Sequence, residues 1–142
     1  MKKITQLLLI FVFVLTLSGC KKKEETPKTK IEYSTEEISL YEYSDGKYYT
    51  NHVDGTVKII KVNVKKTDDD KVNISVGLSV NITKYKNTMN LGVFIKVKLL
   101  DESGNEIDDK YAPNYKNTGY DNPIITFYDV PENATYKIIV EN

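Results

Sequence analysis

The stretch Val72-Asn73-Ile74-Ser75-Val76-Gly77-Leu78-Ser79-Val80-Asn81-Ile82-Thr83 decides the fold of this chain. Aliphatic side chains occupy every second position of the stretch, and small or polar side chains occupy the positions between them. A period of two places all the aliphatic side chains on one face of a β-strand, whereas a helix, with a period of about 3.6, would distribute them around its axis. The stretch therefore predicts a long antiparallel strand with one face in a core and the other in water.

A second strand is predicted over 57–65, with an irregularity inside it. Ile60, Val62 and Val64 share one face, while Val57 and Ile59 are out of phase with them. One extra residue in a strand shifts the phase of the following side chains by one position. The pattern therefore predicts a β-bulge near Ile59 or Ile60.

The remaining predicted strands are shorter and are separated by turns. Alternating apolar residues predict strands over 93–100, 124–128 and 135–140, and weaker patterns predict strands over 38–43, 48–53 and 106–110. Asp45-Gly46 and Asp54-Gly55 are typical of hairpin turns, because Asp-Gly adopts the positive φ angles of a type I′ turn. Seven or eight short strands without an amphipathic helix indicate an all-β fold, either a sandwich or a barrel.

Two segments favour the sandwich. Val130-Pro131-Glu132-Asn133-Ala134-Thr135-Tyr136-Lys137-Ile138 resembles the connection before a late strand in fibronectin-type, immunoglobulin-like and prealbumin-like domains. The segment 99–107 is similar to the mid-domain hairpin of prealbumin-like modules. The resemblance implies an immunoglobulin-like antiparallel β-sandwich over 38–142. It also implies that Tyr136 is a structural corner residue whose hydroxyl bonds back to the corner backbone.

The N-terminal segment indicates where the protein is located. Met1-Lys2-Lys3 is followed by an apolar run that ends at Leu17-Ser18-Gly19-Cys20. This arrangement resembles the signal peptide and lipobox of bacterial lipoproteins. The resemblance implies removal of residues 1–19 and a diacylglycerol on Cys20. The protein would then be lipid-anchored to the cell membrane and face outside the cytoplasm. An ordinary cleaved signal peptide and a short membrane anchor are the alternatives.

Residues 20–37 are predicted to be the lipidated cysteine and a disordered, charged linker, because the segment has few apolar residues to bury. Cys20 is the only cysteine, so a lipid on it would leave no thiol for a disulfide, a nucleophile or a metal. The chain has 20 basic and 20 acidic residues, and every basic residue is a lysine. The balance gives no basic face, which argues against a nucleic-acid partner.

Few residues suggest catalysis or metal binding. His52 is the only histidine, and its neighbours Asn51 and Asp54 indicate a solvated turn. No serine or cysteine lies in a nucleophile motif. The acidic runs, such as Asp68-Asp69-Asp70, do not follow EF-hand spacing and are explained by the preference of Asp for turns. We therefore expect no catalytic residue, no metal and no cofactor.

Tyrosines in one predicted loop are the strongest candidates for binding. Tyr111, Tyr115 and Tyr120 lie within 111–123 among several asparagines. Tyr and Asn make adaptable binding surfaces in loops, although Tyr is also simply a good strand residue. We expect a non-catalytic module that binds an envelope protein or glycan. A structural spacer or accessory subunit of an envelope complex is the alternative, and a small hydrolase is a third, less favoured possibility.

Overall fold

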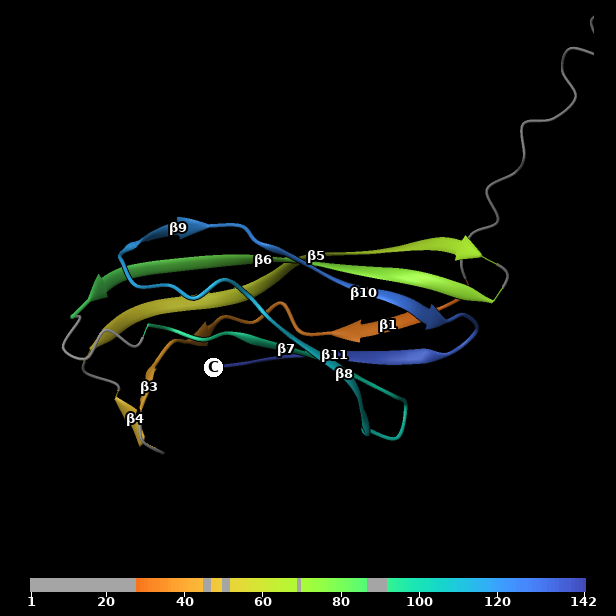
Figure 1. Cartoon of the computed structure of the whole chain (residues 1–142), viewed down its shortest axis with the longest axis horizontal. Coiled ribbons are helices and arrows are strands. Elements are labelled where there is room, and N and C mark those ends of the chain that lie inside the picture. The colour runs from red at the N-terminus through yellow and green to blue at the C-terminus, as the bar shows by residue number, and fades with distance from the viewer. Residues whose placement is uncertain (1–27, 45–46, 50–51, 69, 87–91) are drawn as a thin grey trace, which may run out of the picture.

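The chain folds into two β-sheets packed face to face, as the computed structural model in Figure 1 shows for residues 28–44, 47–49, 52–68, 70–86 and 92–142. The larger sheet has the order β10 (Ile124–Pro131), β6 (Lys71–Tyr85), β5 (Val53–Asp68) and β2 (Ile38–Ser39), and β9 (Gly119–Asp121) also pairs with β6. The smaller sheet has the order β1 (Lys30–Tyr33), β11 (Thr135–Glu141), β7 (Lys96–Leu100) and β8 (Glu106–Tyr111). A separate hairpin of β3 (Glu42–Ser44) and β4 (Lys47–Tyr49) lies at one end.

These two layers confirm the prediction of an all-β sandwich. No helix is present in the described parts of the chain. The strands outnumber the seven or eight expected because β1 and β9 were not anticipated and because the predicted strand 38–43 is divided into β2 and β3.

The core is built around the hairpin of β5 and β6. Every aliphatic side chain at the even positions from Val72 to Ile82 is buried, as the period of two predicts. These side chains face buried side chains of the smaller sheet, among them Val97, Leu99 and Ile138. Burial of each side chain of this size contributes about 2 kcal/mol, so this hairpin supplies a large share of the stability.

A bulge in β5 confirms the irregularity that the sequence predicts. The pairing of β5 with β6 shifts register between Ile59 and Lys61. Val57 before the shift and Val62 after it both pack on the core, whereas Ile60 is left exposed. The extra residue therefore restores the inward phase of the strand and places one large apolar side chain outside.

The hairpin turn predicted at Asp54-Gly55 is wrong, because both residues lie inside β5. Gly55 is so close to β6 that a Cβ atom there would lie 2.6 Å from the Asn81 carbonyl oxygen. Glycine is required here for the close approach of two backbones and not for a turn. The other predicted turn, at Asp45-Gly46, lies outside the described residues.

The strand β1 is a departure from the predicted domain boundary. It pairs in parallel with β11, from Lys30 opposite Thr135 to Tyr33 opposite Ile138. The prediction of a disordered linker over 20–37 is therefore wrong for residues 30–33. Ile31 packs against the core while its charged neighbours face water, an alternation too short to recognise within a charged segment.

The segment 111–123, predicted as a polar loop, contains the strand β9. Tyr120 of β9 lies opposite Asn81 of β6. The backbone NH of Leu78 then donates to the Pro123 carbonyl at 3.0 Å, in the gap between β9 and β10. β9 and β10 therefore follow one another along the same side of β6 and form one interrupted edge of the larger sheet.

Candidate functional site

The three tyrosines of the predicted binding loop lie in three different surroundings. Tyr111 ends β8 and its ring centroid lies 5.4 Å from the Lys96 Nζ. Tyr115 is half-buried, whereas Tyr120 lies exposed on β9. Tyr115 and Tyr120 both line a shallow hollow of about 250 Å³ formed by residues 114–121, and Tyr111 is not part of it. The loop therefore does not present the three rings as one surface.

Tyr115 has a structural role at one end of the sandwich. Its backbone exchanges two hydrogen bonds with Val93, and its ring packs against the core. Its hydroxyl donates to the Asp121 Oδ2 at 2.8 Å. Burial, together with the hydrogen bond to Asp121, raises the pKa of Tyr115 well above its ordinary value, because both disfavour the phenolate. The Tyr115 side chain therefore stabilises the conformation of this loop and is not free to contact a ligand with its hydroxyl.

Tyr120 belongs instead to the outer face of the larger sheet. It lies opposite Asn81, whose side chain points away from the core side of β6. Its hydroxyl accepts a hydrogen bond from the Ser79 Oγ at 3.1 Å, which fixes the ring over the sheet. The side chain is nevertheless 66% exposed, so one face of an oriented ring is open to solvent.

Two further large apolar side chains on β10 share this face, and sequence reasoning did not select them. Ile124 is 72% exposed and lies opposite Gly77, and Tyr128 is 67% exposed further along β10. The signal was available in the sequence. Because Ile125 and Phe127 are apolar and inward, the alternating positions 124 and 128 must face outward, and large apolar residues occupy both.

Together these residues form what we call the outer row, defined as Tyr120, Ile124 and Tyr128. Its positions follow one another at intervals of four residues along the β9–β10 edge, which corresponds to about 13 Å per interval. The neighbouring strand β6 offers only small or polar side chains on the same face: Asn73, Ser75, Gly77, Ser79 and Asn81. The Ser75 and Thr126 hydroxyls lie 3.0 Å apart between Ile124 and Tyr128. The outer row therefore stands beside a strip of small hydroxyl and amide groups.

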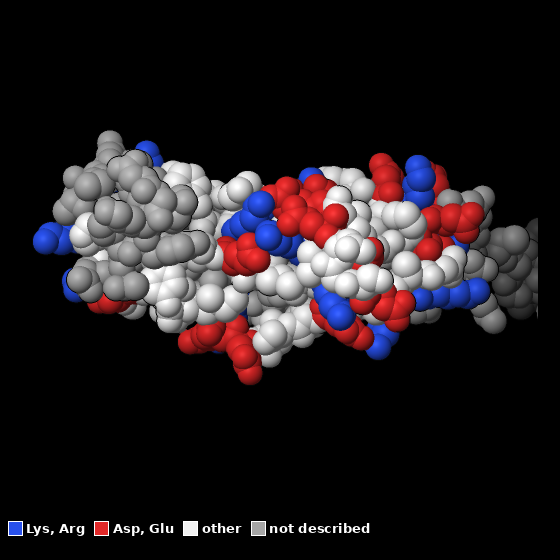
Figure 2. All heavy atoms as spheres, turned by 90° about the horizontal axis from the view of Figure 1, so that it is seen from below, with Lys and Arg blue, Asp and Glu red and all other residues white. Residues whose placement is uncertain are grey.

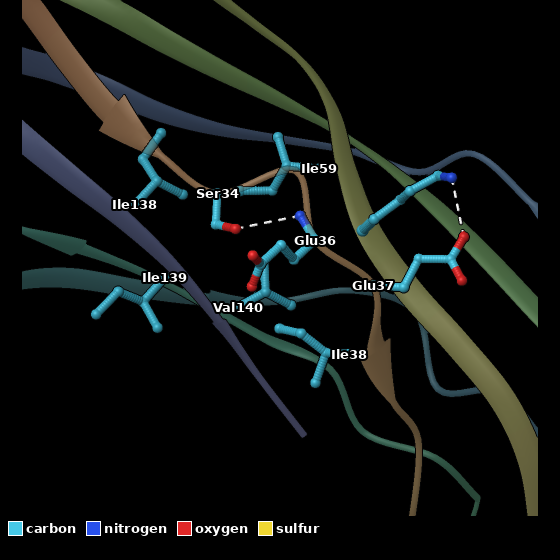
Figure 3. A pocket seen from close by; sticks show the side chains of 9 residues that line it. Ser34, Glu36, Glu37, Ile38, Ile59, Ile138, Ile139 and Val140 are labelled. Atoms are coloured by element: carbon cyan, nitrogen blue, oxygen red, sulfur yellow. Dashed lines mark hydrogen bonds and ion pairs between the residues drawn. The ribbon is translucent and has the colours of Figure 1, made fainter.

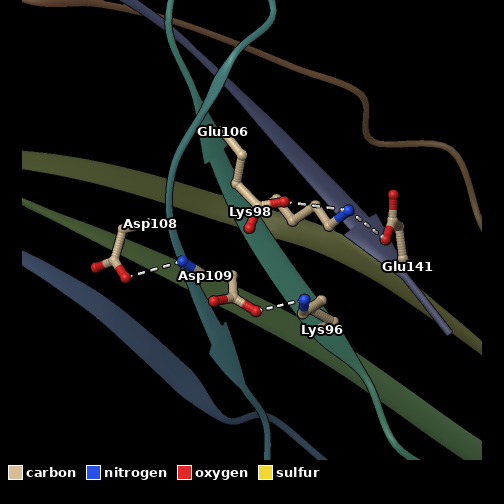
Figure 4. Close-up of polar contacts among 6 residues, drawn as sticks. All are labelled: Lys96, Lys98, Glu106, Asp108, Asp109 and Glu141. Atoms are coloured by element: carbon tan, nitrogen blue, oxygen red, sulfur yellow. Dashed lines mark hydrogen bonds and ion pairs between the residues drawn. The ribbon is translucent and has the colours of Figure 1, made fainter.

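The outer face of the smaller sheet is very different, because most of the charges at its centre are paired. The Lys98 Nζ lies 3.0 Å from the Glu141 Oε2 and 3.2 Å from the Glu106 Oε2, and Lys96 pairs with Asp109 (Figure 4). The hydrogen bond to Glu141, followed by that to Glu106, raises the pKa of Lys98. Figure 2 shows this side of the molecule, with acidic and basic side chains beside one another and no large area of one sign.

A small cavity lies between the sheets where the chain passes from β1 to β2. It has a volume of about 230 Å³ and lies between β11, β5 and the segment 34–38 (Figure 3). Ile59, Ile138 and Val140 form its apolar wall, and the Lys58 Nζ pairs with the Glu37 Oε1 at 2.9 Å at its rim. The only charged groups at the rim are thus carboxylates and a lysine already paired with one of them, which gives no acid and base pair aimed at a substrate.

Tyr136 makes the contact that the resemblance implies. Its hydroxyl donates to the Pro131 carbonyl at 2.7 Å, and the ring is buried. Asn133, in the turn between β10 and β11, has a φ of 63°, a left-handed conformation that Asn tolerates better than most residues. The tyrosine therefore fastens this turn to the start of β11.

The remaining predicted site residues are not described by the structure. Cys20 and the lipobox residues Leu17, Ser18 and Gly19 lie outside the described residues. Within the described ranges, no group of three or more His, Asp or Glu residues is arranged to hold a metal ion. In the same part of the chain, no helix has the length and apolar character needed to cross a bilayer.

Comparison with known proteins finds no matching family model, no matching curated protein and no matching solved structure. The functional inference below therefore depends on the residues and geometry of this chain.

Proposed function

We propose that the protein is a membrane-anchored extracytoplasmic lipoprotein whose β-sandwich is a non-catalytic module that binds an envelope glycan. The observation that carries the binding role is the outer row of Tyr120, Ile124 and Tyr128, each about two-thirds exposed or more on one face of one sheet. Large apolar side chains exposed in line along one edge, about 13 Å apart, are the feature from which we infer an interaction surface. The lipobox-like Leu17–Cys20 carries the proposed location.

A glycan suits this face better than a small apolar ligand. Sugar rings combine apolar C–H faces with many hydroxyls, so they need flat apolar side chains beside small hydrogen-bonding groups. Tyr120 and Tyr128 supply rings, while the exposed Asn81 beside Tyr120 supplies an amide group. The outer row extends about 27 Å along the sheet, which matches a polymer and not a compact molecule. Nothing in this arrangement requires a nucleophile or a metal.

A spacer or accessory subunit is the second candidate function. The charge-paired outer face of the smaller sheet favours it, because charges satisfied within the chain leave little to attract a partner. The two candidates differ in what the outer row does: in a spacer, its side chains are replaceable without loss of function.

A binding assay with matched tyrosine variants separates the two candidates. Full-length protein in detergent is tested against purified peptidoglycan and a glycan array. We expect Tyr120→Ala combined with Tyr128→Ala to weaken binding about tenfold or more, which corresponds to about 1.4 kcal/mol. Tyr111→Ala is the control, since Tyr111 is similarly exposed but is a residue of the smaller sheet. Equal losses in both variants would contradict the outer row as the site, and no binding by well-folded wild type would favour the spacer.

The proposed anchor has its own test. Replacement of Cys20 by Ser removes the thiol that would carry the diacylglycerol. We expect the variant to leave the membrane fraction, because the proposed anchoring depends on the two acyl chains. A variant that sediments with the membranes as the wild type does would overturn the lipoprotein proposal while leaving glycan binding open.

We also propose that the sandwich is of the immunoglobulin-like or prealbumin-like kind. The hydrogen bond from Tyr136 to the Pro131 carbonyl supports this, since a tyrosine fastening the turn before a late strand is a feature of such domains. The parallel pair of β1 with β11 is an addition to the antiparallel arrangement that the resemblance implies.

A further inference from the structure

The long strand β5 has a partner along only part of one side. Along one edge it pairs with β6 from Val53 to Asp68. On its other side, β2 pairs only with Thr56 and Val57. Within the described residues, no strand covers that side from Lys58 to the end of β5. Uncovered edge strands present free backbone NH and carbonyl groups, which a further extended segment can pair with.

The section from Lys61 to Lys66, which we call the β5 edge, has the regular geometry that strand addition requires. Its pairing with β6 runs from Lys61 opposite Gly77 to Lys66 opposite Val72 without a register shift. The bulge lies just before this section and the next shift just after it. The β5 edge is therefore a short, regular stretch of open strand.

The side chains of the β5 edge alternate between two kinds as far as Lys65, and the last inward position holds Lys66, whose Nζ lies 3.2 Å from the Glu132 Oε2. Lys61, Asn63 and Lys65 are exposed and lie opposite the outward residues of β6. Val62 and Val64 face inward and pack against the core, but both stay half-exposed because no strand covers them. Neither Lys61 nor Lys65 has an ion-pair partner within the described part of the chain, unlike the paired lysines of the smaller sheet.

The opposite edge of the sandwich is closed to such an addition. On β8, Lys110 lies with its Nζ 5.8 Å from the centroid of the Phe127 ring and pairs with Asp108. Because Phe127 is fully buried, Lys110 is a charge that points toward the core side of its strand. Inward-pointing charges at an edge oppose strand addition, whereas the inward positions of the β5 edge before Lys66 hold Val62 and Val64.

We propose that the β5 edge binds an extended polypeptide segment in which acidic residues alternate with β-branched apolar residues. Residues directly opposite one another on paired strands share a face of the sheet, so a partner strand places carboxylates opposite Lys61 and Lys65 and apolar side chains opposite Val62 and Val64. A second copy of this edge does not fit, because its lysines would face lysines. The proposal is independent of glycan binding, since the outer row stands on the β9–β10 edge and the β5 edge lies across β6 from it, with its lysines on the same face of the sheet.

The test uses synthetic peptides and full-length protein in detergent. The probe is acetyl-TEVTVET-amide, and the comparison peptides are acetyl-TKVTVKT-amide and the scrambled acetyl-TVEETVT-amide. We expect the alternating acidic peptide to bind at least about tenfold more tightly than either comparison peptide. In the lysine peptide, both cross-strand charge pairs become repulsive. In the scrambled peptide, the glutamates no longer lie opposite Lys61 and Lys65. Equal binding of all three peptides, or none by the acidic one, would overturn the proposal.

A charge reversal then tests the site itself. In Lys61→Glu combined with Lys65→Glu, the preference is expected to reverse toward the lysine peptide. Lys86→Glu combined with Lys116→Glu is the matched control, with the same change in net charge at two exposed lysines elsewhere, and should bind as the wild type does. Unchanged binding by the first variant would contradict the assignment.

Hydrogen exchange distinguishes strand addition from simple attraction of charges. Peptide binding should slow exchange of those amides between Lys61 and Lys66 that point away from β6, because they become hydrogen-bonded to the added strand. An acidic peptide held only by charge would leave their exchange rates unchanged, and that result would also overturn the proposal.

Discussion

On the outer face of the smaller sheet, Lys98 lies between two carboxylates, whereas on the outer face of the larger sheet Tyr120, Ile124 and Tyr128 remain open to solvent. The two faces rest on the same core. The first has partners within the chain for most of its charges, although Tyr111 and Ile139 are exposed on it. The second carries the three most exposed large apolar side chains among the described residues. We therefore propose the larger sheet as the binding face, because favourable contacts remain to be made there.

The largest effect is expected from breaking the core that both faces share. Val76 is fully buried at the centre of β6, so Val76→Asp places an unpaired charge in the core and should cost about 4 kcal/mol or more. Denaturant unfolding measures the loss, and Asn81→Asp on the exposed face of the same strand is the control. A soluble Val76→Asp protein of wild-type stability would show that the two faces do not share this core.

A smaller effect should separate the tyrosines of the predicted loop. Tyr115→Ala removes a ring that packs on the core and should cost about 2 kcal/mol. Tyr120→Ala removes a mostly exposed ring and should change the free energy of unfolding by less than about 0.5 kcal/mol. Chemical denaturation of the two variants measures both values. Similar losses would mean that Tyr120 is also structural, which would weaken the contrast between the faces.

These expectations show how far the sequence predicts the fold. The alternation from Val72 to Ile82 was sufficient for β6, because burial on one face directly produces a period of two. The phase change near Ile59 was sufficient for the bulge. The turn predicted at Asp54-Gly55 was wrong, because the same dipeptide occurs both in tight turns and where two backbones approach closely. The two cases are distinguished only by the Asn81 carbonyl oxygen beside Gly55, which the sequence does not reveal.

The candidate site was less predictable for a related reason. Sequence spacing placed Tyr111, Tyr115 and Tyr120 in one loop, but a strand and a bridge within that loop give the three side chains different surroundings. Exposure of Ile124 and Tyr128 depends on which phase of β10 faces inward. That phase follows from Phe127 once the strand is known, so the outer row becomes visible only after β10 is placed beside β6.

A third effect concerns alkaline pH. The pKa of Tyr115 is raised above its ordinary value of 10.0 in the folded protein. Above that pH the unfolded chain loses the tyrosine proton first and is stabilised, so folding stability falls as the pH rises. In Tyr115→Phe this contribution is absent, and the decline measured by urea unfolding between about pH 9 and pH 11 should be less steep. Some decline remains, because burial also raises the pKa of Tyr136. If stability declined equally steeply with pH in Tyr115→Phe and in wild type, the raised pKa of Tyr115 would be contradicted.

The smallest effect is expected on the charge-paired face itself. Lys98→Met removes the cation between Glu106 and Glu141 and keeps the apolar part of the side chain. Ion pairs at the surface, such as these between the half-buried Lys98 and two exposed carboxylates, contribute little. The melting temperature should therefore fall only slightly, and the difference from wild type should disappear in about 1 M salt. The same substitution should leave glycan binding unchanged, because this face is proposed to have its charges satisfied internally. Loss of binding in Lys98→Met would reverse the comparison and transfer the binding role to the smaller sheet.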